Sequence, residues 1–162
     1  QTRSSSQEAE NGSVEFRVTD ASDTILEESA GPVTIGGGAF QSIYTFENNT
    51  TDATSITRSL IATDSFRLVR DRVLFKFING SNELVDVYIL RPGQDLDEVA
   101  PLLNDMGFAG QQNSESIAND VEYVVRNSDN TETLASISNT QQEGVSYTLV
   151  FDTQGVLHLL ID

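Results

Sequence analysis

His158 is the only histidine in the chain, and it lies in the apolar segment 156–160. A histidine acts as a general base for a nucleophile beside it, but the sequence has no cysteine and no Gly-x-Ser-x-Gly elbow. Alternation along this segment places His158 opposite Leu157 and Leu159, as in a strand. We therefore expect a sheet histidine beside a polar partner, and we predict that the protein is not an enzyme.

Two oxygen-rich segments are the candidates for metal binding: Asp20 with Asp23, and Asp95 with Asp97 and Glu98. Calcium takes carboxylate and carbonyl ligands of this kind, but neither segment has the residue order of an EF-hand loop. Carboxylates also serve glycosidases, which need two of them facing each other across a cleft. These five residues are weak calcium candidates. No other cofactor is expected, because the absence of cysteine removes thiolate metal sites.

The charge is strongly acidic, with 25 Asp and Glu against 9 Lys and Arg, and a net charge of −16. Nucleic-acid binding is excluded, because it depends on Lys and Arg meeting phosphate. No apolar run reaches the ~18–20 residues of a membrane span, so membrane insertion is not expected. The polar, cysteine-free composition favours a secreted bacterial protein at the cell surface. We expect a signal peptide to have been removed before Gln1.

The elements that must hold any site are short and extended. Apolar and polar residues alternate over segments of 4–8 residues, separated by turn signals, which is typical of an all-β sandwich. The predicted strands cover residues 14–18, 24–27, 33–35, 40–46, 56–61, 73–78, 84–90, 116–117, 121–125, 133–137, 145–151 and 156–161. A helical turn is predicted within 95–105. Residues 1–13 form a polar arm that we expect to be mobile, and residues 47–52 and 109–113 are predicted loops.

The sequence contains an internal repeat, which predicts two modules of unequal size. Residues 14–20 (VEFRVTD) match 121–127 (VEYVVRN), and residues 60–64 (LIATD) match 159–162 (LLID). Residues 14–64 therefore repeat 121–162, whereas 70–120 has no counterpart before the first copy. We predict a partial sandwich module at 14–64, a linker at 65–72 and a complete immunoglobulin-like antiparallel sandwich module at 73–162.

Several motifs in the second module run in the order of a known extracellular family. They are FKFING (75–80), VDVYI (85–89), APLL (100–103), Gly107-Phe108 and GVSYTLV (144–150). In this order they resemble the domain-of-unknown-function family 4397 over residues 70–162. The departure is Gly80-Ser81-Asn82, where the family has an Ala-Ser-Pro type of turn. The resemblance implies a secreted or surface-anchored β-sandwich, often in tandem, with no established catalytic activity.

A half module cannot bury its own apolar face. Leaving several such side chains in water forfeits on the order of 10 kcal/mol at ~25 cal/mol per Å², and its sheet edges lack partners. Three completions are open: strands from another copy of the chain, packing on the second module, or residues upstream of Gln1. We expect the first, which gives head-to-tail growth of a homopolymer. The predicted assembly interface comprises Val14, Phe16, Val18, Phe40, Ile43, Arg67, Arg70 and Arg72.

The three arginines of that interface belong to a basic joint between the modules, which also contains Arg58 and Lys76. Such a joint suits an acidic neighbour, and it is equally typical of a solvated linker. The sequence thus predicts a self-assembling surface fibre subunit or adhesin. The alternative is a soluble module that binds glycans or calcium. Sugar sites use exposed aromatic rings, and Tyr88 is the only tyrosine whose position in a strand suggests one.

Overall fold

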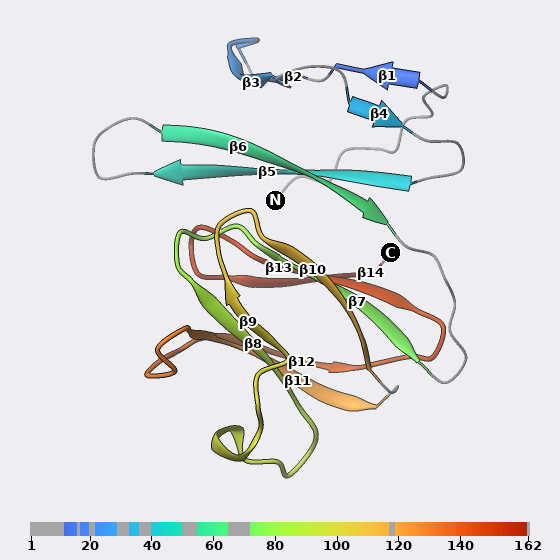
Figure 1. Ribbon diagram of the computed structural model, residues 1–162, viewed down its shortest axis with the longest axis vertical. Helices are drawn as coiled ribbons and strands as arrows, with labels where there is room; N and C mark the ends of the chain where they lie inside the picture. The colour runs from blue at the N-terminus through green and yellow to red at the C-terminus, as the bar shows by residue number, and fades with distance from the viewer. Residues whose placement is uncertain are drawn as a thin grey trace. The chain divides into compact units, whose positions relative to one another are not determined.

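The computed structural model describes residues 12–15, 17–19, 22–28, 33–35, 40–49, 55–64, 72–116 and 119–161. These residues are almost all in strands (Figure 1). The prediction of an all-β protein is therefore confirmed. The chain divides into two compact units, one of residues 1–45 with 59–64 and one of residues 46–58 with 65–162. No helix in the described part of the chain is long and apolar enough to cross a bilayer.

The N-terminal strands form two-stranded sheets. β1 (Gly12–Val14) pairs with β4 (Val33–Ile35), and β2 (Arg17–Thr19) pairs with β3 (Ile25–Glu28). β5 (Phe40–Asn49) pairs with β6 (Ser55–Asp64). The strand predicted at 14–18 is thus two strands. The loop predicted at 47–52 is wrong for residues 47–49, which continue β5.

The eight remaining strands, β7 to β14, form two four-stranded sheets that we call the C-terminal sandwich. The first sheet has the order β10 (Gln111–Ser116), β7 (Val73–Asn79), β13 (Ser146–Phe151), β14 (Leu157–Ile161). The second has the order β12 (Thr133–Thr140), β11 (Asp120–Asn127), β8 (Val85–Leu90), β9 (Leu103–Met106). Neighbouring strands are antiparallel except β7 and β13, which are parallel.

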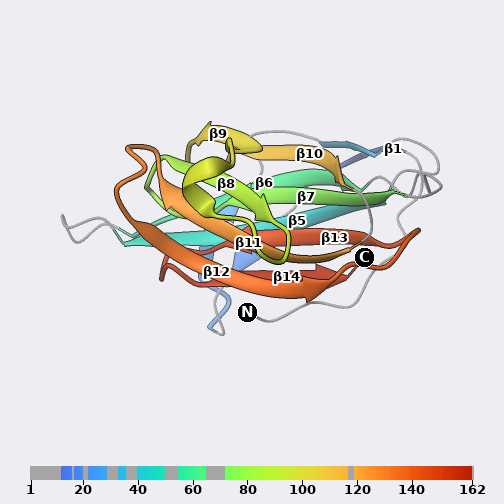
Figure 2. The same ribbon diagram turned by 90° about the horizontal axis from the view of Figure 1, so that it is seen from below.

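The two sheets share one hydrophobic core. Alternate residues of the long strands point into it, because successive side chains of a strand face opposite sides of the sheet. Each fully buried apolar side chain contributes about 1.5–3 kcal/mol. The fully or almost fully buried members from β7, β8, β11 and β13 are Val73, Phe75, Phe77, Val85, Val87, Tyr123, Val125, Tyr147, Leu149 and Phe151. These side chains form the core of a β-sandwich, whose strands are drawn in Figure 2.

β8 is buried on both faces, which its alternating sequence did not indicate. Val85 and Val87 enter the main core, while Tyr88 and Leu90 form a second cluster with Val124 of β11. Two side chains that follow β8 pack against this second cluster: Leu96 and Val99. The loop after β8 therefore folds over the outer face of the second sheet.

Two predicted elements in this region are wrong in part. The helical turn predicted within 95–105 is reduced to the 3-10 turn η1 (Leu96–Glu98), and residues 103–106 form strand β9. Leu103 points into the main core rather than continuing a helix with Leu96. The loop predicted at 109–113 is also shorter than expected, because residues 111–116 form β10. This polar strand has no apolar alternation, and it is held in the sheet by backbone pairing with β7.

The turn after β7 is fixed by Asn79, whose side chain is completely buried. Its amide donates to the carbonyl oxygens of Glu83 and Met106, each at 2.7 Å. Its Oδ1 accepts hydrogen bonds from the backbone N–H and the hydroxyl of Ser81. The ring of Phe46 covers the adjacent Gly80 so closely that a Cβ on Gly80 would lie 2.1 Å from it. A glycine is required here because no side chain fits beneath the ring.

Candidate functional site

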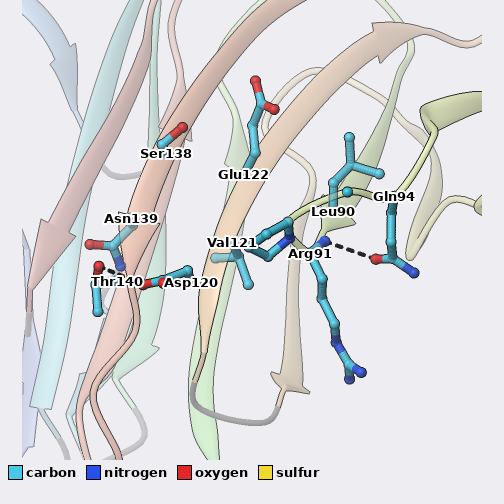
Figure 3. Close-up of a pocket in the computed structure, with 11 residues that line it drawn as sticks. Leu90, Arg91, Gln94, Asp120, Val121, Glu122, Ser138, Asn139 and Thr140 are labelled. Carbon is cyan, nitrogen blue, oxygen red and sulfur yellow. Dashed lines mark hydrogen bonds between the residues drawn. The ribbon is translucent and has the colours of Figure 1, made fainter.

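A cleft of about 500 Å³ lies at one end of the second sheet. Three segments far apart in the sequence line it: residues 90–94, which end β8 and form the following turn, residues 120–122 at the start of β11, and residues 138–140 at the end of β12. Figure 3 shows the β12 side chains on the left, those of β11 in the centre and those of the 90–94 segment on the right. The volume falls within the range of small-ligand pockets, ~300–1,000 Å³.

The register of the sheet sets the residues on the floor of the cleft. Glu122 pairs with Leu90 on one side and with Ser138 on the other, so these three side chains form a row across three strands. One row further on, Asp120 pairs with Thr140, and the Thr140 hydroxyl donates to Asp120 Oδ1 at 2.8 Å. The floor is therefore a polar surface of carboxylates and hydroxyls with one apolar residue.

The turn that forms one wall of the cleft is held by an internal hydrogen bond. Gln94 Oε1 accepts a hydrogen bond from the backbone N–H of Arg91 at 2.8 Å (Figure 3). Gly93 has φ +83°, a left-handed conformation that favours glycine. Two carboxylates and one guanidinium line the cleft. Its chemistry suits a ligand with several hydrogen-bond donors, and none of its lining residues is a nucleophile activated by a histidine.

A partly buried polar network lies beside the second cluster on the same sheet. Asp86 accepts hydrogen bonds from the backbone N–H of Asp105 at 2.8 Å and from Asn130 Nδ2 at 3.2 Å. Tyr88 donates its hydroxyl to Asn130 Oδ1. Burial, together with the nearby charge of Asp86, raises the pKa of Tyr88 above its ordinary value of 10.0. Tyr88 is only 4% exposed, so it forms part of this network and offers no open ring to a sugar.

His158 has a polar partner, as the sequence predicted, and the partner is the carboxylate of Asp152. Its Nε2 is 2.6 Å from Asp152 Oδ2. The other oxygen of Asp152 accepts hydrogen bonds from the backbone N–H groups of Gln154 and Val156, each at 2.9 Å. Burial opposes ionisation of Asp152, but these hydrogen bonds outweigh it and hold the pKa of the carboxyl below its ordinary value of 3.8. The pair closes the β13–β14 turn.

The described residues among those predicted to bind calcium make separate local contacts and do not form one cluster. Asp95 caps η1, accepting a hydrogen bond from the backbone N–H of Asp97 at 3.1 Å. The Asp97 carboxylate lies 3.3 Å from the Arg126 guanidinium, and Glu98 is exposed. Asp23 is exposed with φ 61°, and Asp20 lies outside the described residues. Within the described ranges, no three acidic or histidine side chains are placed to hold a metal ion together.

The predicted assembly residues fall mainly on the N-terminal strands. Val14 is in β1, Val18 is in β2 and Phe40 begins β5. Ile43, also in β5, is 50% exposed. Arg72 is exposed just before β7. Three of the predicted residues lie outside the described ranges: Phe16, Arg67 and Arg70. Lys76 of the basic joint is buried within β7, so it is not part of a solvated linker.

Sequence reasoning did not find the cleft. Its residues come from three segments that no local motif connects, and only the pairing of β8, β11 and β12 brings them together. The sequence Arg91-Pro92-Gly93 is a local turn signal, but it does not indicate a site.

No family model matches the chain, and no curated protein matches it at a significant level. The resemblance to family 4397 therefore stays a prediction.

Proposed function

We propose that the protein is a non-enzymatic, extracellular structural or adhesive protein that assembles head to tail through its N-terminal half. In this proposal, residues 14–64 are a partial module that a neighbouring chain completes. The observation that carries it is a correspondence of strand pairing. β2 pairs with β3 and β5 pairs with β6, just as β11 pairs with β12 and β13 pairs with β14 in the matching residues of the second copy.

The second copy has additional partners that the first copy lacks in its described residues. β11 also pairs with β8, and β13 also pairs with β7. β2 and β5, which correspond to β11 and β13, each belong to a two-stranded sheet in the described part of the chain. A two-stranded sheet is marginally stable alone. Strands equivalent to β7 and β8, supplied by a neighbour, would complete it by β-strand addition.

We also infer that the C-terminal sandwich is immunoglobulin-like. In variable-type immunoglobulin domains, one sheet has the order G-F-C-C′, and strands B and E are neighbours in the other. The order β12-β11-β8-β9 follows the first arrangement, and the pair β7-β10 follows the second. The arrangement departs from the immunoglobulin fold at β13. When β7 is matched to strand B, β13 takes the place beside it that strand A has in an immunoglobulin domain.

Electron microscopy of the purified full chain tests the assembly proposal, with filaments as the expected result. Ile43→Asp places a charge on β5 at a side chain that is 50% exposed, and we expect it to abolish filaments. Leu84→Asp is the matched control, because Leu84 is 53% exposed and lies next to β8 in the C-terminal sandwich. Dispersed particles of the unchanged protein at all concentrations would reject the proposal.

The cleft favours a second candidate function, a soluble module that binds a glycan. Its carboxylates, hydroxyls and amides match the many donors and acceptors of a sugar, and its volume of about 500 Å³ accommodates a small ligand. A glycan array tests this candidate. Binding should be lost in Glu122→Ala, which removes the central carboxylate of the floor, and retained in Glu132→Ala, which changes an exposed acid outside the cleft.

A further inference from the structure

One side of the C-terminal sandwich is formed by the edge strands of its two sheets. β14 ends the first sheet and β12 ends the second, and the two strands contact each other (Figure 2). Among the residues that the structure describes, neither strand has a partner on its outer edge. Each therefore presents N–H and C=O groups that are able to pair with a further strand.

These two strands lack the residues that normally protect an edge. Charged side chains and prolines on an edge strand discourage pairing with another chain. β12 (TLASISNT) and β14 (LHLLI) contain no Asp, Glu, Lys, Arg or Pro, although 21% of the chain is charged. On the opposite side of the sandwich, each edge strand contains an acid, Asp105 in β9 and Glu115 in β10. The β12–β14 side is therefore the unprotected one.

The core is also less well covered on the β12–β14 side. Ile161 at the end of β14 is 62% exposed. On the β9 side, Leu103 and Met106 are 2% and 8% exposed, so the core is closed there. Four apolar side chains of β12 and β14 pack against the core but remain only partly buried: Leu134, Ala135, Ile137 and Leu159. A partner on this side would remove further apolar surface from water.

We propose that the β12–β14 side is a contact between two copies of this chain, in which each β14 pairs antiparallel with the other. A net charge of −16 makes two copies repel each other over most of their surface, so a close contact favours strands without carboxylates. Two identical antiparallel strands related by a two-fold axis present the same surface to each other. The first sheets of both copies then form one continuous sheet, and β12 of each lies beside it.

This contact is separate from the strand completion proposed above, and each can exist without the other. A two-fold contact closes after two copies, whereas head-to-tail growth does not close. The effect of salt on association distinguishes the β12–β14 contact from docking of the basic joint on an acidic neighbour. Screening weakens an attraction between opposite charges, but it relieves the repulsion that opposes an uncharged contact.

Sedimentation of the full chain carrying Ile43→Asp, in which head-to-tail growth does not mask a dimer, tests the proposal over a range of concentrations and NaCl. We expect a reversible dimer whose dissociation constant falls as salt rises. Ile161→Lys and Ser136→Lys each add a charge to an exposed position on this side and should raise that constant about tenfold or more, equal to ~1.4 kcal/mol. Leu102→Lys is the control, since Leu102 is 40% exposed and directly precedes β9.

A protein that stays monomeric at every concentration would overturn the proposal, as would a dimer that Leu102→Lys weakens equally or that salt dissociates. Thermal melting confirms that each variant is folded, and Ser136→Lys provides a second test if Ile161→Lys is unstable. Absence of filaments in the unchanged protein with the dimer retained would reject the strand completion alone. Loss of the dimer in Leu102→Lys together with Ile161→Lys would reject the edge contact alone.

Discussion

The ring of Phe46 meets the ring of Phe108 edge to face, with 6.2 Å between the ring centroids and 73° between the ring planes. Phe46 comes from β5 and is 5% exposed, and it also covers Gly80 in the turn after β7. A side chain distant in sequence thus closes the turn that joins β7 to β8. The absence of a side chain on Gly80 makes this possible.

Gly80→Ala should lower the free energy of unfolding by about 1–3 kcal/mol, because the new methyl group overlaps the Phe46 ring. Urea denaturation measures the change. Gly107→Ala is a matched control, since its Cβ would lie 3.5 Å from Leu84, an ordinary contact. In a Phe46→Ala background the cost of Gly80→Ala should shrink, because the overlap is gone. An unchanged cost there would contradict the proposed cause.

Asn79→Asp should destabilise the protein by about 3 kcal/mol or more. The substitution replaces the amide that donates to Glu83 and Met106 with an acceptor, which leaves two carbonyl oxygens without a donor at a completely buried position. Asn113→Asp, at an exposed position on β10 of the same sheet, should change stability by less than about 0.5 kcal/mol. Equal thermal midpoints for the two variants would show that the buried amide is not important.

Asp152→Asn should destabilise the protein in a pH-dependent way. The pKa of Asp152 is below 3.8 in the folded protein, so its ionised form adds stability above the unfolded value and loses it as the pH falls through the folded value. We expect a difference of about 1 kcal/mol or less near pH 6, because the carboxylate is only partly buried. The difference should narrow below pH 3.8. Asp129→Asn, in an exposed turn, is the control, and a difference that grows with acid would contradict this account.

Removal of calcium should leave the melting temperature unchanged. Asp95 is occupied as the cap of η1, and Asp97 lies beside Arg126, so these carboxylates do not converge on one point. Melting in EDTA and in excess calcium measures the effect. A rise in melting temperature with calcium that Asp97→Asn abolishes would restore the predicted site.

The apolar strands could be predicted from the sequence because each has a clear alternation or a short apolar run. Residues 73–78, 121–125 and 145–151 are examples, and the structure places strands at all three. β10 was predicted only at its last residue, Ser116, because an edge strand held by backbone pairing needs no apolar residues. β8 was predicted with one exposed face, because the loop that covers Tyr88 and Leu90 follows it in the sequence and its path depends on tertiary packing.

The candidate site was less predictable than the fold. His158 was expected beside a polar partner, and that partner is Asp152, six residues away in the same hairpin, which the sequence did not identify. The cleft depends on a register that aligns Leu90, Glu122 and Ser138 across three strands. A shift of one residue in that pairing would turn Glu122 to the other face of the sheet. The spacing of these residues in the sequence does not predict that register.

The parallel pairing of β7 with β13 constrains the order in which the chain acquires its structure. Leu74 pairs with Ser146, so the middle of the first sheet is joined only after residue 146 has been made. Pairings between distant residues form slowly, because a long loop must close before they form. During synthesis, β7 emerges many residues before its central partner. Until then the apolar side chains of this strand lack the central partner that they have in the finished sheet.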